Sequence, residues 1–515
     1  MDKNRMKRQM RRYRRPGAMM RMGRIVVSLL MLGMVTVVAT GLGGTLALKL
    51  GWVTRIQVFP LAVAGSVTGL VSWLLVTVLF GRLYCSWVCP LGTVQDCAAR
   101  LTRTGAKRRR HTYSFAEPAN VLRYTVLGVV VVCMITGMAV LPALLDPMSA
   151  YGRIASELLR PVLGIAFESG SAKGIAPASG WAALIAAVTL VVVGLCAIRS
   201  GRLWCNTICP VGSFLSIFSR YSFYHIDIDT DVCTNCHSCE RACKAQCINV
   251  SEHQVDGSRC VMCFDCLDAC PEGAIRYTYR RKRLSWPLMQ KVAGTAASAM
   301  DSRKTPRPLN EAADKTVDKA TDNAGDDRVR ISRRQFMATG LLVAAMPVIG
   351  KLTGDNERHP APAAPPGRLS MSDFLQRCTA CGVCVANCPT GVLRPSLNEF
   401  GWTHTMQPVM DFGRGYCEYN CTRCTEVCPP RVLEPLTTEE KHIYIIGKAQ
   451  VDAELCVGCG RCAWSCPRQV IAMEKRPGRE RPVAVVNEAL CIGCGKCQNV
   501  CPVKPLTAIY VEGVR

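Results

Sequence analysis

The sequence predicts a membrane α-helical fold of four transmembrane helices, joined to α+β ferredoxin-like domains. Two observations carry this prediction. Residues 25–48, 57–81, 119–142 and 181–198 are long apolar runs, and 24 of the 32 cysteines fall into six short quartets. Each run approaches the roughly 20 residues that a helix needs to cross a bilayer. Mean hydropathy is +0.15 although 20% of residues are charged, so apolar and polar segments must be segregated along the chain.

The cysteine quartets predict the cofactor. Five have the spacing C-x2-C-x2-C-x3-C, and one is stretched by a residue. The regular quartets are Cys233, Cys236, Cys239, Cys243; Cys260, Cys263, Cys266, Cys270; Cys378, Cys381, Cys384, Cys388; Cys456, Cys459, Cys462, Cys466; and Cys491, Cys494, Cys497, Cys501. The stretched quartet is Cys417, Cys421, Cys424, Cys428. Three thiolates at this spacing hold one cluster, and the fourth, usually followed by proline, ligates the neighbouring cluster. We therefore expect six [4Fe–4S] clusters, with iron bound through these cysteines.

Other uses of cysteine fit this spacing poorly. Disulfide frameworks belong to short secreted chains, and zinc sites usually separate two C-x2-C pairs by a longer gap. The segment from Cys233 to His237 matches the C-x-x-C-H haem signal, but both of its cysteines already belong to a quartet. All seven histidines lie outside the apolar runs, and neither common nucleotide-binding glycine motif is present. We expect no haem, flavin or nucleotide site.

The formal net charge of +25 suggests nucleic acid, but the placement of the charges favours a membrane. Ten Lys and Arg residues lie in the first 24 positions and six more in residues 100–110, whereas the opposite loops carry few. This asymmetry follows the positive-inside rule. It predicts a multi-pass protein of the bacterial cytoplasmic (inner) membrane, with the lipid bilayer as a partner and no nucleic acid. The N-terminus and residues 225–287 are then cytoplasmic.

A twelve-residue motif occurs twice. Residues 81–92 and 201–212 both read G-R-L-aromatic-C-x3-C-P-apolar-G, and each copy follows the second apolar run of a pair. Two such halves would bring Cys85, Cys89, Cys205 and Cys209 to the same depth at the cytoplasmic membrane face. These candidate redox or metal thiols fit a thiol redox pair, a metal site or part of a quinone pocket. The simpler alternative is a turn shaped by Gly and Pro, with buried cysteines.

The pattern predicts six segments along the chain. They are a basic cytoplasmic N-terminus (1–24), a four-helix membrane domain with the duplicated motif (25–224), a two-cluster ferredoxin domain (225–287), a flexible linker (288–330), a twin-arginine signal or anchor with a Pro-Ala spacer (331–369), and a four-cluster ferredoxin domain (370–515).

Three local features refine this division. Arg333-Arg334 precedes the apolar run 338–352, which is typical of twin-arginine export and predicts a periplasmic last domain. The segment 361–363 resembles a cleavage site. In the first quartet Lys244 replaces the usual proline, so Cys247 is an alternative fourth ligand, although the spacing favours Cys243. Asp146, before Pro147, fits a helix stop or a proton-carrying group.

These residues resemble known families. The apolar runs, the duplicated C-x3-C-P motif, the first two quartets and the segment 145–154 resemble the NapH/NosR-type membrane ferredoxins. The twin-arginine motif and the last four quartets resemble the NapG/MauM ferredoxins. The resemblance implies electron transfer between the quinone pool and a partner oxidoreductase, often periplasmic.

Three hypotheses for function follow. The first is a subunit that takes electrons from quinol and passes them to a partner enzyme, as a component of a quinol dehydrogenase. The second is a conduit fed by a cytoplasmic donor. The third, from a different class, is a metal-handling or reductase protein or an assembly factor that uses the paired C-x3-C-P cysteines.

Overall fold

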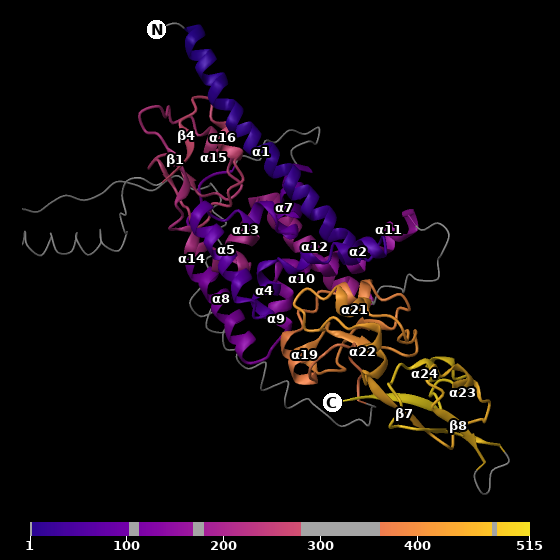
Figure 1. The fold of residues 1–515 in the computed structure, drawn as a ribbon. Helices are drawn as coiled ribbons and strands as arrows, with labels where there is room; N and C mark the ends of the chain where they lie inside the picture. Colours follow the sequence, from indigo (N-terminus) through magenta and orange to yellow (C-terminus); the bar gives the residue numbers. More distant parts are fainter. Residues whose placement is uncertain (1–2, 102–112, 168–179, 280–360, 476–480, 515) are drawn as a thin grey trace, which may run out of the picture. The chain divides into compact units, whose positions relative to one another are not determined.

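A computed structural model describes residues 3–101, 113–167, 180–279, 361–475 and 481–514 (Figure 1). By their contacts, the described residues up to Thr278 and from Ala361 onward belong to one unit. The predicted linker at 288–330, Arg333-Arg334 and the run 338–352 lie outside the described residues.

The first part of the chain is helical. Its helices are α1 (Lys3–Thr40), α2 (Thr45–Lys49), α3 (Trp52–Arg55), α4 (Val58–Val63), α5 (Val67–Phe80), α6 (Tyr84–Trp87), α7 (Pro90–Leu101), α8 (Asn120–Ile135), α9 (Val140–Leu145), α10 (Pro147–Ile154), the π-helical turn η1 (Ala155–Leu159), α11 (Arg160–Phe167), α12 (Gly180–Ser200), α13 (Leu203–Thr207) and α14 (Pro210–Ser219). α1 ends before the predicted run 25–48 does, because Gly41, Gly43 and Gly44 adopt positive φ angles that continue no helix.

Helix length does not confirm four complete spans. Among the described residues, only Gly17–Thr40 of α1 and Gly180–Ser200, which is α12, are long and apolar enough to cross a membrane. The predicted run 57–81 is divided into α4 and α5, with Gly65 at positive φ between them, and the run 119–142 is interrupted at Gly137. The 14 residues of α5 and the 16 of α8 span about 21 and 24 Å, less than the roughly 30 Å hydrocarbon core.

The duplicated motif forms two short helical hairpins. The first is α6 followed by α7, and the second is α13 followed by α14, each turning at a Cys-Pro pair. α7 packs against α12, α10 and α1, and α14 packs against α5 and α8 (Figure 1). The two hairpins therefore lie inside the helical bundle rather than on its surface loops.

A small ferredoxin-like module follows α14. Its elements are β1 (Tyr224–Ile228), α15 (Ser238–Ala242), β2 (Ile248–Asn249), β3 (Gln254–Val255), α16 (Asp265–Ala269) and β4 (Ile275–Tyr279). β1 pairs with β4 and β2 with β3, while α15 packs on α16. The module contacts α1, where Arg21 pairs with Asp265 at 3.1 Å and Gly17 packs against Leu267.

The last domain repeats this pattern. Its elements are α19 (Met371–Arg377), α20 (Val383–Ala386), β5 (Leu393–Pro395), the 3-10 turn η2 (Trp402–His404), β6 (Pro408–Met410), α21 (Arg423–Glu426), α22 (Thr438–Ile443), β7 (Gly447–Val451), α23 (Arg461–Ser465), β8 (Ile471–Glu474), β9 (Val483–Val486), α24 (Lys496–Val500) and β10 (Ile509–Gly513). The antiparallel pairs are β5 with β6, β7 with β10 (Val451 opposite Ile509), and β8 with β9 (Ile471 opposite Val486). α23 and α24 pack on each other beside β7 and β8 (Figure 1).

The Pro-Ala stretch is part of this domain rather than a spacer. Ala363 and Ala364 are buried, Met410 N donates to Ala363 O at 2.9 Å, and Gly513 N donates to Ala361 O at 2.8 Å. In the structure this domain therefore includes residues that precede the expected boundary at residue 370. A cut after Ala363 would separate backbone that is hydrogen-bonded into the domain.

The last domain contacts the far end of α1. Asn387 Nδ2 donates to Val38 O at 2.9 Å, and Gly41 packs beneath the carbonyl of Ala386. Gly17, at the contact with the first ferredoxin module, and Val38 are separated by 21 helical residues, or about 32 Å. One helix therefore joins two cysteine-rich domains at positions about 32 Å apart.

The contact at Gly41 gives a prediction. Its φ is +70°, and a Cβ there would lie 2.6 Å from Ala386 O. Replacing Gly41 with Ala should weaken the contact by at least the roughly 1–2 kcal/mol that a left-handed residue costs, which is about 5- to 30-fold in equilibrium. A protease site inserted within 288–330 allows the measurement: after cleavage, less of the 361–515 fragment should remain bound to the helical part.

Gly33→Ala is the matched control, because nothing lies within 4 Å of a Cβ at that position. Equal retention of the fragment by both variants would contradict the contact between α1 and α20.

Candidate iron–sulfur and thiol sites

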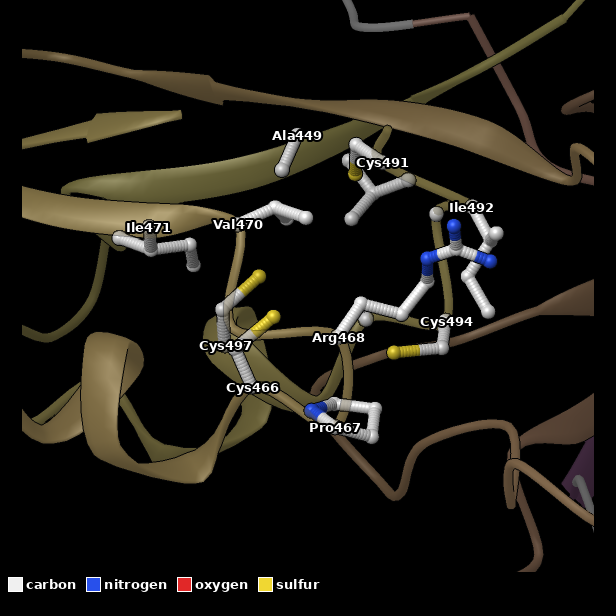
Figure 2. Close-up of a pocket in the computed structure, with 13 residues that line it drawn as sticks. Ala449, Cys466, Pro467, Arg468, Val470, Ile471, Cys491, Ile492, Cys494 and Cys497 are labelled. Carbon is white, nitrogen blue, oxygen red and sulfur yellow. The ribbon is translucent and has the colours of Figure 1, made fainter. Parts of the chain in front are cut away.

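The predicted quartets exchange their fourth cysteines in pairs. One cavity, shown in Figure 2, is lined by Cys491, Cys494 and Cys497 together with Cys466 of the preceding quartet. A second is lined by Cys456, Cys459, Cys462 and Cys501, and a third by Cys417, Cys421, Cys424 and Cys388. Cys428 in turn lies close enough to Cys378 and Cys384 to interact with them electrostatically. The third quartet is thus paired with the stretched one, and the fifth with the sixth along the chain.

Local backbone geometry explains why three cysteines face one cavity. In every regular quartet the residue after the second cysteine has a positive φ: these residues are His237, Phe264, Gly382, Gly460 and Gly495. A short helix that carries the third cysteine begins directly afterwards. The stretched quartet lacks this turn, since Thr422 has a φ of −117°. Glycine adopts the left-handed turn without the cost that His237 and Phe264 bear.

The cysteine sets fit an iron–sulfur cofactor. All 32 cysteines are described and free of disulfides. Over the described ranges, no three His, Cys, Asp or Glu side chains converge closely enough to hold one metal ion. Four thiols around a cavity, too far apart for one ion, suit a cluster of several iron and sulfide atoms, because thiolates are its usual ligands.

The first ferredoxin module has a cavity lined by five cysteines. Cys260, Cys263 and Cys266 are joined there by both Cys243 and Cys247, whose sulfur atoms are 3.6 Å apart. A hydrogen bond from Cys247 lowers the pKa of Cys243, and the same contact raises the pKa of Cys247. Cys243 is therefore the easier thiol to ionise, but either sulfur can reach the cavity. We call this the second pocket; Cys270 lies near Cys239 of the first pocket.

Lys244, in place of the usual proline, ties this module to the helices. It is 3% exposed, and its Nζ lies 2.8 Å from Asp265 and 3.4 Å from Asp96 of α7. Burial disfavours an ionised Asp96, but Arg202 and Lys244 outweigh burial and hold the pKa of its carboxyl below the usual value. Proline has no charged side chain and could not form these ion pairs.

The duplicated motif places its four cysteines close enough to one another to interact electrostatically. Arg202 Nη1 donates to Cys85 O at 2.7 Å, and Arg82 Nη2 donates to Cys205 O at 3.1 Å, so each arginine crosses to the other hairpin. The same guanidinium groups lie 3.6 Å from Cys85 Sγ (Arg82) and 3.9 Å from Cys205 Sγ (Arg202). All four cysteines are buried. We call this group, with its two arginines, the thiol centre.

The glycine that ends each motif makes room for the crossing arginine. A Cβ on Gly92 would lie 2.6 Å from Arg202 Nη1, and one on Gly212 would lie 2.8 Å from Arg82 Nη2. The turn shaped by Gly and Pro is therefore real, and it forms part of the thiol centre.

The two hairpins also dock the first ferredoxin module. Arg82 Nη1 donates to Ser258 O at 3.1 Å and Ser86 Oγ to Met262 O at 3.3 Å. On the second hairpin, Arg202 N donates to Lys244 O at 3.0 Å. The loops that carry the cysteines of the second pocket therefore rest directly on the thiol centre. The sequence signal for this contact was the Gly-Arg pair before each C-x3-C, whose role we did not predict.

Asp146 lies where one helix ends and the next begins, which matches the simpler of its two predicted roles, the helix stop. α9 ends at Leu145, and the Asp146 side chain caps α10 by accepting from Ser149 N at 2.7 Å. The same helix positions the last domain, because Gly152 packs against the backbone of Cys381, where a Cβ would lie 2.5 Å from the carbonyl oxygen. The third quartet thus rests on α10.

Sequence reasoning missed Lys441. Its side chain is fully buried, and Nζ donates to Cys417 Sγ at 3.2 Å. Twenty-four residues separate the two, so no local motif could have connected them. Cys417 N also donates to Cys494 O at 2.8 Å, which joins the two pairs of quartets.

Comparisons with known proteins agree with this division. A family described as a 4Fe-4S binding domain matches residues 63–109 and again 179–225, and each match contains one copy of the helical hairpin and the helix before it. A 4Fe-4S dicluster domain matches 377–432 and 455–504, the same pairs of quartets that exchange cysteines. Two further 4Fe-4S binding domains match 230–246 and 260–274.

Three curated relatives illustrate the similarity. The ferredoxin-type protein NapH of Haemophilus influenzae is 28% identical over 212 residues, covering 39% of this chain and 64% of the relative. The methylamine utilization ferredoxin-type protein MauN of Paracoccus denitrificans is 28% identical over 214 residues, 40% of this chain and 64% of the relative. The methylamine utilization ferredoxin-type protein MauM of Methylobacillus flagellatus is 30% identical over 146 residues, covering 25% of this chain and 60% of the relative. The chain thus spans slightly less than two thirds of each of these relatives, and they support an iron–sulfur electron-transfer role.

Lys441 gives a test of electrostatic tuning. A buried cation about 5 Å from the cluster should stabilise its reduced form by about 1–3 kcal/mol at an effective dielectric near 20, or roughly 50–150 mV for one electron. Lys441→Met should lower the reduction potential of one cluster by that amount, measured by redox titration followed by electron paramagnetic resonance. Lys448→Met, on β7, should leave all potentials unchanged; a shift of equal size there would refute the assignment.

The five-cysteine cavity gives a second test. Because their sulfur atoms are 3.6 Å apart, Cys243→Ser and Cys247→Ser should each retain the cluster of the second pocket, whereas the double variant should lose about four iron atoms. Iron content of the purified protein measures this. Loss of iron in only one single variant would instead identify the sole fourth ligand.

Proposed function

We propose that this protein conducts electrons across the cytoplasmic membrane through six [4Fe–4S] clusters, between the quinone pool and a periplasmic oxidoreductase. Each cluster, when bound, accepts and releases one electron. The observation that carries the proposal is that two cysteine-rich domains dock on one apolar helix at points about 32 Å apart. That separation matches the roughly 30 Å hydrocarbon core of a bilayer.

The contacts support a route through the chain. Cys270 beside Cys239 connects the first and second pockets, and the second pocket rests on the thiol centre. On the other side, the third quartet rests on α10, and the hydrogen bond between Cys417 and Cys494 links the remaining pockets. The route would end at the pocket of the fifth quartet, where Cys459 is exposed.

Charge and apolar surface support the membrane assignment. The outward surface of α12 carries exposed large apolar side chains, including Leu184, Val188, Val191 and Leu195. Water would disfavour such a surface, whereas lipid would not. The basic residues near the start of α1 fit a cytoplasmic N-terminus. Four helical passes remain part of the proposal, with α4 extending the pass of α5 and α9 extending that of α8.

The thiol centre does not favour the metal-handling alternative. Two guanidinium groups lie beside its sulfur atoms, and their positive charge would repel a free metal cation. The conduit fed by a cytoplasmic donor shares every contact described above. It differs only in the electron source, which the experiment below distinguishes.

A two-part experiment tests the proposal. A C-terminal tag should be accessible to protease on intact spheroplasts, and an Arg333→Lys/Arg334→Lys variant should leave it protected. In inverted membrane vesicles, a ubiquinol or menaquinol analogue should bleach the visible absorbance of the clusters. A protected tag in the unmodified protein would refute transfer across the membrane. Bleaching by reduced soluble ferredoxin but by neither quinol would select the cytoplasmic-donor conduit.

A further inference from the structure

We propose that Cys85, Cys89, Cys205 and Cys209 hold a seventh iron–sulfur cluster at the junction of the two helical hairpins. This inference rests on the proposed electron-transfer function and deepens it. The two hairpins supply two cysteines each, in equivalent positions of the repeat, and each cysteine is 4–5% exposed. The ligand set is thus built by both halves of the chain, and neither half completes it alone.

Each of the four sulfur atoms faces an N–H donor. Arg82 Nη2 lies 3.6 Å from Cys85 Sγ, and Gln95 Nε2 lies 3.4 Å from Cys205 Sγ. Gly212 N donates to Cys209 Sγ at 3.4 Å, and the backbone of Gly92 donates equivalently to Cys89. N–H groups directed at sulfur are the contacts that stabilise cluster thiolates and set cluster potentials.

The buried positive charges around the thiol centre favour an anionic cofactor. Arg24, Arg202 and Lys244 share the carboxylate of Asp96, and Lys244 also reaches Asp265. Arg82 and Arg123 are about 1% exposed, and within the described residues no carboxylate lies within ion-pair distance of either. Burying unpaired charge is costly. Four thiolates around a [2Fe–2S] or [4Fe–4S] core carry about −2, which would offset two of these cations.

The position of the centre gives the cluster a role. The loops of the second pocket rest on both hairpins, through Ser258, Met262 and Lys244. On the opposite side, α7 packs against α10, on which Cys381 of the third quartet rests. The thiol centre therefore lies between the cysteine-bearing loops of the two domains, where the six-cluster route has its one interval without a ligand set.

Other uses of these cysteines fit less well. The four thiols are free rather than paired in disulfides. Among the described side chains they do not converge closely enough for a single metal ion. A cofactor with several metal atoms satisfies both observations.

The test counts iron in the full-length chain, reconstituted without oxygen in detergent. Six [4Fe–4S] clusters account for about 24 iron atoms, so the unmodified protein should hold about 26 or 28. The variant Cys85→Ser/Cys205→Ser should retain only about 24 iron atoms. After reduction with dithionite, it should also lack one electron paramagnetic resonance signal that the unmodified protein shows. Cys97→Ser/Cys133→Ser is the control, because neither cysteine belongs to any set, and it should match the unmodified protein.

A second variant guards against misfolding. Gln95→Leu removes a donor to Cys205 without removing a buried charge, and it should shift the potential of that one signal while the iron content stays unchanged. Equal iron in the unmodified protein and in Cys85→Ser/Cys205→Ser, at about 24 atoms, would overturn the seventh cluster and leave the proposed function intact. Loss of all iron only in Cys85→Ser/Cys205→Ser, together with an unshifted signal in Gln95→Leu, would also overturn it. Absence of clusters from the unmodified protein would instead refute the proposed function itself.

Discussion

The crossing of Arg82 and Arg202 is the interaction on which the rest of the fold depends. Each arginine belongs to one hairpin and holds the carbonyl of the first cysteine in the other. Both are almost completely buried, so removing one partner would leave a buried charge or an unpaired carbonyl, which typically costs several kcal/mol. Because Arg82 also holds Ser258, the same side chain joins the two halves of the helical bundle to the first ferredoxin module.

The exchange of fourth cysteines applies the same constraint in the cysteine-rich domains. The fourth cysteine of one quartet lines the cavity of another, so a single quartet supplies only three of the four cysteines of its own cavity. The domains are therefore built from pairs of quartets. The short strands and one-turn helices between the cysteines bury little apolar surface by themselves. Cysteines consequently form a large part of the hydrophobic clusters, as at Cys388, Cys417, Cys424 and Cys428.

The features that the sequence predicted well are local ones. The three-residue steps between cysteines specify a turn, which the left-handed residues at His237 and Gly382 provide. The duplicated motif predicted that its two copies are equivalent, and each forms a short helical hairpin. Apolar composition was less informative: it could not show that Gly65 and Gly137 interrupt two of the four runs. The spacing predicted that each fourth cysteine serves a neighbouring cluster, but it could not show which quartets pair. The burial of Ala363 and the contact of Lys441 with Cys417 depend on residues far apart in the chain, so no spacing rule could predict them.

The excess of basic residues in this chain has two physical origins. One part lies near the start of α1 and in residues 100–110, where it fits attraction to a negative membrane face. The other part is buried beside sulfur: Lys441 at Cys417, Arg82 at Cys85 and Arg202 at Cys205. Thiolate clusters carry negative charge into sites of low dielectric, and a buried cation stabilises that charge more than an exposed one can. Under the proposed function, cations of the second kind mark where the chain would hold anionic redox groups, which is a stronger indication of function than the net charge itself.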